Sequence, residues 1–272
     1  MKIAIKVFPI LLLLAIAPIS SFAQAIALAP AQIVENFKPG VPFEYALNVQ
    51  NKGSEAVDLH VQITDFWYND KNEKVFTAPG TSPRSAANWI QFVPETFQVP
   101  PGTTQQMKAV ITPPSDARGG YYAVLFVEST PVATNKQTDD GRRVFTNMRL
   151  GCLVLLTAKD TEQYNVTVND LKLAPPDSTQ SLRLTYDIDN ESNTHIFTQG
   201  HLAILDPEHK LVAKAESGVK RFLPGQKDSM KVDWSGELPP GDYTAVLSQV
   251  YGDTRVETRQ IAFTIPAKTA SK

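Results

Sequence analysis

The sequence contains a single cysteine, Cys152, among its 272 residues, so no disulfide can form within the chain. It also lacks a strong charge of either sign, because 26 basic side chains are balanced by 28 acidic ones. Without a segment rich in Lys and Arg, the chain has no electrostatic footprint for binding nucleic acid. The fold must therefore depend on apolar cores, and a hydrophobic content of 42% is enough to build them.

Catalytic and cofactor-binding motifs are absent as well. The sequence has no G-x-S-x-G nucleophile turn, no P-loop and no G-x-G-x-x-G dinucleotide motif. Its histidines lie neither in HExxH spacing nor beside a cysteine pair, so we expect no metal site; they are His60, His195, His201 and His209. Cys152 lies among apolar neighbours, where a cysteine usually behaves as a small hydrophobic residue. We therefore predict a protein that has no cofactor and is not an enzyme.

Long apolar runs are confined to the N-terminus. Lys2 and Lys6 flank the start of an apolar run from Phe8 to Ile19, and Ser21-Phe22-Ala23 has the small-x-small pattern of a cleavage site. The apolar run is short for a bilayer span, and the sequence contains no second candidate. We interpret residues 1–23 as a signal peptide. The mature protein is then expected to be exported, periplasmic or secreted, with no membrane span after cleavage.

Two similar stretches, Pro101–Val127 and Pro224–Leu247, lie about 120 residues apart. Both begin with Pro-Gly, carry Met-Lys five residues past that glycine, and lead through a glycine turn to a tyrosine that opens an apolar strand. A repeat of this length indicates two similar domains in tandem rather than a short-period solenoid. Alternating apolar residues and turn signals recur along the mature chain without a long helical period, which is typical of an all-β protein.

The tyrosines that open these two strands, Tyr121 and Tyr243, indicate the type of β domain. In immunoglobulin-like sandwiches, a tyrosine near the start of strand F hydrogen-bonds to nearby backbone, two residues before the position that antibodies fill with cysteine. Ala123 and Ala245 occupy that position here. We therefore predict two tandem immunoglobulin-like β-sandwich domains without intersheet disulfides. The expected boundaries are an N-terminal domain at 24–158, a C-terminal domain at 159–266 and a disordered tail at 267–272.

For two apolar strands in the N-terminal domain, the sequence does not identify what packs against or pairs with them. The strand from Tyr121 to Val127 is apolar on both faces, so one face needs a cover that the sequence does not identify. The longest predicted strand, Arg143 to Thr157, carries an alternating row on one face: Met148, Leu150, Cys152, Val154 and Leu156. Such a strand either pairs inside its sheet or offers an open edge to a partner strand. In the second case main-chain hydrogen bonds bind the partner, and the row would be inserted into it.

Several phrases of the N-terminal half resemble a known family. Ile26 to Pro30, Asn88-Trp89-Ile90, Val99 to Gly102 and Gly119 to Phe126 look like the first domain of PapD-type pilus-assembly chaperones, which have tandem immunoglobulin-like domains. The resemblance implies a periplasmic, chaperone-like binding protein that assists the assembly of surface-fibre subunits by β-strand addition. Its partner would be a protein subunit of a surface fibre or another envelope protein.

The resemblance stops at one site of that family. The pilus chaperones carry a basic pair in the cleft between their domains, which holds the terminal carboxylate of the subunit. The matching first-strand region here, Pro30 to Ile33, has no arginine, and the matching part of the long strand, Leu153 to Leu156, has no lysine. Arg149 and Lys159 are cations near these segments, but they do not match the motif.

The C-terminal half also resembles a second family, the WxL-interacting surface proteins of Gram-positive bacteria. The similar phrase consists of Leu223-Pro224-Gly225, Val232-Asp233-Trp234 and Pro240 to Tyr243. This resemblance implies an alternative function, an envelope or cell-surface binding module whose ligand is peptidoglycan or a protein. The sequence leaves both functions open.

Overall fold

The computed structural model describes residues 26–137, 140–176, 180–252 and 254–267. The predicted signal peptide at residues 1–23 and most of the predicted tail lie outside these ranges. Within them, no helix has the length and hydrophobicity needed to cross a membrane.

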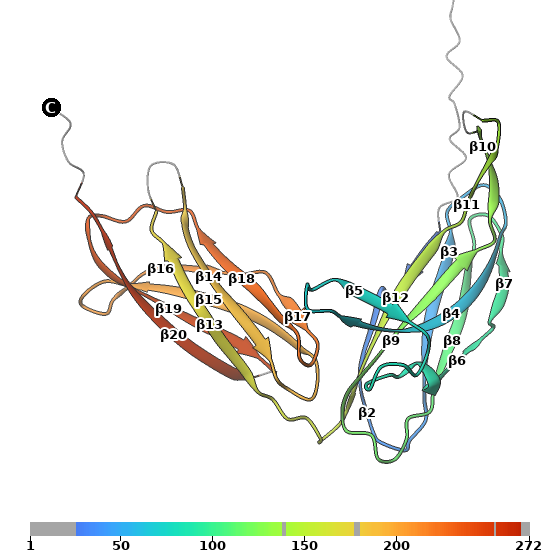
Figure 1. The fold of residues 1–272 in the computed structure, drawn as a ribbon, viewed down its shortest axis with the longest axis horizontal. Helices are drawn as coiled ribbons and strands as arrows, with labels where there is room; N and C mark the ends of the chain where they lie inside the picture. Colours follow the sequence, from blue (N-terminus) through green and yellow to red (C-terminus); the bar gives the residue numbers. More distant parts are fainter. Residues whose placement is uncertain (1–25, 138–139, 177–179, 253, 268–272) are drawn as a thin grey trace, which may run out of the picture.

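The chain folds into two β-sandwiches set at an angle and joined at one end, so that the molecule has the outline of a V (Figure 1). Apart from one turn of 3₁₀ helix, η1 (Ala87–Trp89), the regular structure of the described residues consists of strands. The predicted fold class, two tandem β-sandwich domains, is confirmed. The segment between the two sandwiches runs from Ala158, the last residue of one strand, to Val166, the first residue of the next.

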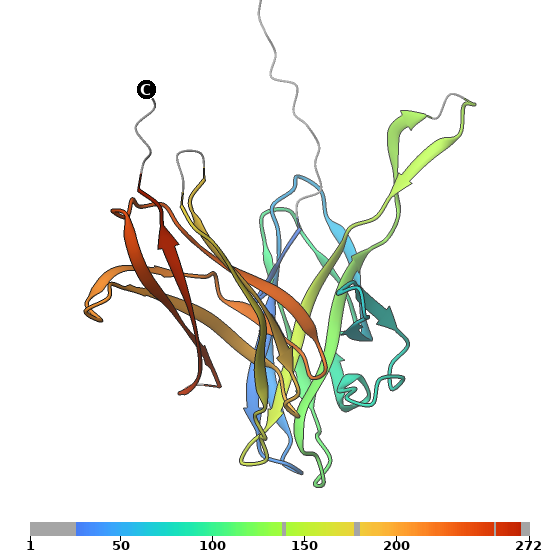
Figure 2. The same cartoon turned by 60° about the vertical axis from the view of Figure 1, so that its left-hand side comes forward.

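The first domain pairs a four-stranded sheet, β1-β3-β8-β6, with a larger sheet, β2-β12-β9-β4-β5, in which β7 also pairs with β4. A separate hairpin, β10-β11, projects from the body of the domain (Figure 2, light green). The bounds are β1 (Ile26–Ala29), β2 (Gln32–Phe37), β3 (Phe43–Asn51), β4 (Val57–Tyr68), β5 (Lys74–Thr77), β6 (Ile90–Val93), β7 (Thr96–Val99), β8 (Thr104–Ile111), β9 (Gly119–Ser129), β10 (Val132–Gln137), β11 (Arg143–Thr146) and β12 (Arg149–Ala158).

The core of the first domain lies between these two sheets. Leu47 of β3, Met107 of β8 and Leu125 of β9 are fully buried there, because alternate residues of each strand face the opposite sheet. Burying side chains of this size stabilises the fold by roughly 1.5–3 kcal/mol each. Cys152 of β12 belongs to the same core, and its burial raises the pKa of the thiol to about 11.

The second domain pairs the sheet β13-β14-β18 with the sheet β16-β15-β19-β20, and β17 adds to β15. Its core includes Leu184, Tyr186 and Leu247. The bounds are β13 (Val166–Ala174), β14 (Leu182–Asn190), β15 (Ile196–Leu205), β16 (Leu211–Glu216), β17 (Lys220–Phe222), β18 (Lys227–Trp234), β19 (Gly241–Tyr251) and β20 (Arg255–Ile265).

The two tyrosines at the strand openings bond to backbone close by in sequence. The hydroxyl of Tyr243 donates to the carbonyl of Pro239 at 2.9 Å. The hydroxyl of Tyr121 accepts a hydrogen bond from the amide of Arg118 at 3.2 Å. Ala123 and Ala245, two residues further along, are buried in their respective cores. Both strands therefore have the geometry of a tyrosine corner.

The long strand predicted from Arg143 to Thr157 is wrong as a single element, because it is divided into β11 and β12. Between them Met148 bonds to Ser129, the last residue of β9. The amide of Met148 donates to the Ser129 hydroxyl, and its carbonyl accepts from the Ser129 amide, each at 2.9 Å. The hairpin beyond this point separates from the main sheet as β10-β11.

The first strand, β1, lies at the edge of the smaller sheet, and the chain changes sheets after Ala29. β1 pairs with β3 in the smaller sheet, whereas β2 pairs in parallel with β12 in the larger one. Pro30 lies at the crossing, where its missing N–H costs no ladder hydrogen bond. The consequence for β12 is that only its second half is covered by β2.

Candidate functional site

Among the described residues, no strand pairs with one edge of the first half of β12. β12 pairs with β9 along its whole length, but β2 covers it only from Leu153 onward. The amide of Leu153 donates to Ala31 on the β2 side at 3.1 Å, while the carbonyl of Met148 accepts from β9. Because successive residues of a strand alternate in direction, the backbone N–H and C=O of Arg149 and Gly151 point away from β9. Four backbone groups of this segment are therefore available to another strand.

The structure divides the predicted apolar row into two parts. Cys152, Val154 and Leu156 lie in the core of the first domain with exposed fractions of 0%, 1% and 0%. Their side chains fill the space between the sheets, so in this structure they are core residues and not an inserted row. Met148 and Leu150 remain half-buried at the uncovered half of the strand. The predicted contact row is thus reduced to these two residues, and their role stays a prediction.

The end of the sandwich beside Leu150 is open between two sheet edges. β1 is the edge of the smaller sheet, and it contacts β12 across the domain. Ile26 and Leu28 of β1 are only partly buried, although both pack against the core. A strand placed along Arg149–Cys152 would therefore meet apolar side chains of both sheets.

Charged and aromatic side chains lie together on the outer face of β12 and its neighbours β9 and β4. Arg149, Glu128 and His60 lie opposite one another on β12, β9 and β4. Glu128 forms an ion pair with Arg149 and lies 3.3 Å from the Nε2 atom of His60. The guanidinium of Arg149 also lies 3.7 Å from the ring centre of Phe126. The glycine at 151 leaves room for that ring, because a Cβ there would lie 3.0 Å from it.

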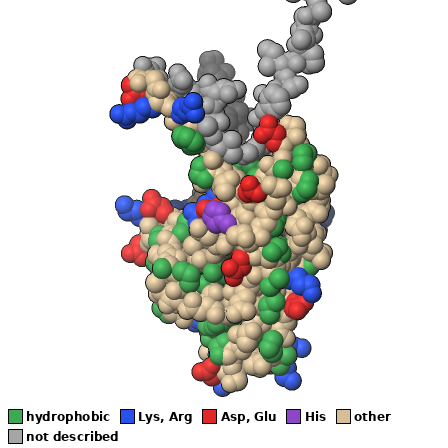
Figure 3. Space-filling view, turned by 90° about the vertical axis from the view of Figure 1, so that its right-hand side faces the viewer, with side chains coloured by type: hydrophobic (Ala, Val, Ile, Leu, Met, Phe, Trp, Pro, Cys, Tyr) green, Lys and Arg blue, Asp and Glu red, His purple; other side chains and the backbone are tan. Residues whose placement is uncertain are grey.

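The first-domain surface seen in Figure 3 carries basic and acidic groups interspersed with hydrophobic side chains. On this side of the molecule no extended patch of one charge is present. Among the described residues no group of three or more His, Cys, Asp and Glu side chains could hold a metal ion.

The second domain supplies the missing cover for the apolar strand β9. Tyr122, Val124 and Phe126 form a cluster on the outer face of the larger sheet, together with Phe66 and Leu155. Leu223, from the turn after β17, inserts into this cluster and is only 4% exposed. The apolar outer face of β9 is therefore part of the contact between the domains.

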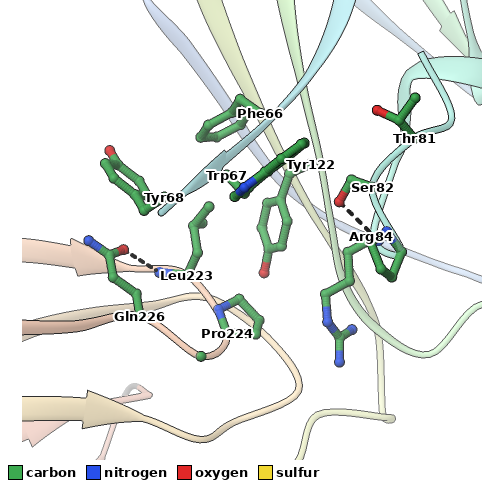
Figure 4. Close-up of a pocket in the computed structure, with 12 residues that line it drawn as sticks. Phe66, Trp67, Tyr68, Thr81, Ser82, Arg84, Tyr122, Leu223, Pro224 and Gln226 are labelled. Carbon is green, nitrogen blue, oxygen red and sulfur yellow. Dashed lines mark hydrogen bonds between the residues drawn. The ribbon is translucent and has the colours of Figure 1, made fainter. Parts of the chain in front are cut away.

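Beside Leu223 a cavity of about 360 Å³, partly open to solvent, lies between the two domains (Figure 4). Its walls are mostly aromatic and apolar, and they include Phe66, Trp67, Tyr68, Arg84, Tyr122 and Leu223. The hydroxyl of Tyr122 is buried beside Thr194 and His195, without a hydrogen bond of good geometry to either. Burial raises the pKa of this hydroxyl, so it stays protonated.

Arg84 lines this cavity, and Arg221 lies nearby and bonds to Tyr68 of its wall. In the described part of the chain neither arginine has a carboxylate within 4 Å. Arg84 is held by the loop before η1: its carbonyl accepts from the amide of Tyr122 at 2.8 Å, and its guanidinium donates to the carbonyl of Gly120 at 3.2 Å. Arg221 of β17 donates to Gln32 and to the hydroxyl of Tyr68, each at 3.4 Å. Both cations act on the Tyr122 hydroxyl, so the polar side of the cavity is electropositive.

His195 lies under this site as a buried, neutral side chain. Its ring packs edge-on against Tyr122 and Phe197, with centroid distances of 5.8 and 5.6 Å. Burial and, to a smaller extent, the charge of Arg221 lower its pKa to about 4. The protonated form is therefore strongly disfavoured in the folded protein.

Acid is expected to destabilise the protein through His195. An unfolded histidine binds a proton below about pH 6.5, whereas the folded one resists it down to about pH 4. Above the unfolded pKa of about 6.5, His195 is neutral in both states and the full unfolding free energy is present. Between that pH and pH 4.5, roughly 2–3 kcal/mol of unfolding free energy is lost. Urea unfolding at pH 7 and pH 4.5 measures this loss. His195→Gln should show a smaller fall, and an equal fall in both proteins would contradict this assignment.

The cavity could not be found from the sequence. Arg84 follows a polar loop and Arg221 lies in a three-residue strand, and neither belongs to a motif. One signal was present: the apolar outer face of β9 required a cover. Arg149, one of the two cations noted in the sequence, does not line this cavity. It is paired with Glu128 on the outer face of the sheet near the open edge.

No protein-family model matches the sequence, and no curated protein matches it significantly. Several solved structures are similar in fold. One is a chain of the chaperone–tip adhesin complex of CFA/I fimbriae, with a TM-score of 0.47 and 12% identity. Another is the class 5 fimbriae chaperone CfaA, with a TM-score of 0.47 and 10% identity. Each match covers 89% of this chain and 100% of the other chain. The E. coli chaperone DraB has a TM-score of 0.42 at 12% identity, with 89% and 98% covered.

These likenesses concern the fold. The similar structures named here are fimbrial chaperones or their complexes, the kind of protein that the sequence resembles. The resemblance to the WxL-interacting proteins is not tested by them and stays a prediction.

Proposed function

We propose that this protein is a non-enzymatic, chaperone-like binding protein of the periplasm that holds a surface-fibre subunit by β-strand addition. The observation that carries the proposal is the unpaired edge of β12 from Arg149 to Cys152. An edge with free N–H and C=O groups is a template for another strand. Here the edge is short and lies beside the half-buried side chains of Met148 and Leu150.

The edge supplies both parts of strand recognition. Main-chain hydrogen bonds to Arg149 and Gly151 would fix the register of an added strand, and each contributes about 0.5–1.5 kcal/mol. Leu150 and the partly buried Ile26 would contact the alternate side chains of that strand. A partner with an incomplete sandwich would gain the most from this contact, because its own apolar residues need a cover.

The cations beside the cavity between the domains favour a partner whose terminal carboxylate binds there. Arg84 and Arg221 have no carboxylate partner within 4 Å among the described residues. A terminal carboxylate would accept hydrogen bonds from both guanidinium groups. Arg221 also reaches Gln32, in the first-strand region where the pilus chaperones carry their arginine. The cation would thus come from the second domain.

Co-expression with the products of neighbouring genes tests the function. We expect a neighbouring fibre subunit to co-purify with this protein, and the double variant Arg84→Ala/Arg221→Ala to lower the yield of complex at least about tenfold through the lost charge-assisted bonds. A protein that always elutes alone, or that instead sediments with isolated peptidoglycan, would contradict the proposal. The second result would favour the envelope-binding module.

A further inference from the structure

Besides the insertion of Leu223 into the apolar cluster and the hydrogen bonds of Arg221 to Gln32 and Tyr68, the two domains touch at two places on either side of the cavity. The first is the base, next to the linker. There the amide of Gly120 donates to the carbonyl of Asn193 at 2.9 Å, and the hydroxyls of Thr157 and Thr194 lie 2.9 Å apart. Both threonines are almost completely buried. The side-chain amide of Asn193 donates to the carbonyl of Thr161 as well, which ties the linker to the same point.

The second contact is made by a two-stranded arm. β4 pairs with β9 only as far as Thr64, and from Asp65 to Tyr68 it pairs with β5 alone. The resulting β4–β5 arm leaves the first domain and extends toward β17 of the second (Figure 1). Its tip, residues 69–73, consists of polar side chains only.

Asn72 attaches the tip of the arm to the second domain. Its side-chain amide donates to the carbonyl of Lys227 at 2.7 Å, and its side-chain oxygen accepts from the side-chain amide of Gln226 at 3.3 Å. Gln226 in turn accepts from the backbone amide of Leu223 at 3.0 Å. Asn72 is therefore linked, through the side chain of Gln226, to the backbone of Leu223, which lines the cavity.

The base and the tip differ in how firmly they hold. At the base, buried groups and the covalent linker act together. At the tip, two hydrogen bonds near the surface connect polar residues, and no apolar side chain of residues 69–73 is buried with them. Contacts of the second kind open at much lower free energy than buried ones. Any opening of the domains would therefore start at the tip and turn about the base.

We propose that the β4–β5 arm is a latch, and that the partly open cavity widens for a ligand when Asn72 leaves the turn formed by Gln226 and Lys227. Phe66, Trp67 and Tyr68 at the root of the arm and Leu223 beyond its tip are opposite walls of the same cavity. The latch concerns access to the cavity, so it does not depend on which protein or molecule binds there.

Trp67 provides a reporter for the latch. The chain contains three tryptophans, and only Trp67 lines the cavity. Fluorine NMR of the full chain labelled with 5-fluorotryptophan would resolve them, and Trp67→Phe would assign the signal. Asn72→Gly removes the attaching side chain without strain, because Asn72 has a φ of 58°, which glycine adopts freely.

In Asn72→Gly we expect the relaxation of the Trp67 fluorine by a soluble gadolinium chelate to rise at least about threefold, since two lost hydrogen bonds shift the open population by about tenfold. The signals of Trp89 and Trp234 should not change. Lys71→Ala, which alters a neighbouring exposed side chain, is the matched control. Asn72→Asp, which keeps the acceptor but not the donor, should give an intermediate rise. Unchanged accessibility of Trp67 in both Asn72 variants would overturn the latch, whether or not a fibre subunit binds.

Discussion

Alanine at Gly119 is expected to lower the unfolding free energy by roughly 2–3 kcal/mol more than alanine at Gly102, and to uncouple the two domains. Both glycines have a positive φ, 71° and 70°, so both substitutions carry the same backbone strain. A Cβ at Gly119 would also lie 2.4 Å from the carbonyl oxygen of Asn193, whereas a Cβ at Gly102 meets nothing within 4 Å. The extra loss therefore reports the contact at the base of the two domains.

Calorimetry and urea unfolding measure both parts of this result. The wild-type protein and Gly102→Ala should unfold with one transition or two overlapping ones. Gly119→Ala should separate them, since the turn around Asn193 is displaced from the first domain. Equal losses in the two variants would show that the base does not hold the domains in the way described.

Aspartate at Leu150 is expected to reduce partner capture by at least about a hundredfold, because a charge would be buried in the joint apolar contact. The free protein should lose little stability, since Leu150 is only half-buried and the carboxylate can reach water. Co-purification yield and a thermal melt measure the two effects separately.

Val154→Asp is the matched comparison for this variant. Val154 lies on the same strand and the same face, but it is 1% exposed and part of the core. Its replacement should unfold the first domain outright. If Leu150→Asp captured the partner as well as the wild-type protein does, the edge of β12 would not be the contact.

Much of the fold was predictable because its signals are local. The alternation of apolar residues in β3, β4 and β14 follows from the period of two. The repeated Pro-Gly and tyrosine phrases indicated two similar sandwiches. These features depend on residues near one another in sequence.

The parts that the sequence did not indicate depend on distant residues. The parallel pairing of β2 with β12 brings Gln32 beside Leu153, and it decides that only Arg149–Cys152 has a free edge. The cavity likewise combines Arg84 of the first domain with Arg221 of the second. Each arginine is an ordinary polar residue in its own segment, so no pattern marks it.

Amide hydrogen exchange at Arg149 and Gly151 tests the central claim most directly. In the free protein we predict that these two amides exchange at least about a hundredfold faster than those of Leu150 and Cys152, which point toward β9. Binding of a subunit should slow Arg149 and Gly151 to the rate of their neighbours. Equal protection of all four amides in the free protein, or no slowing in a purified complex, would contradict an open edge that receives the partner strand.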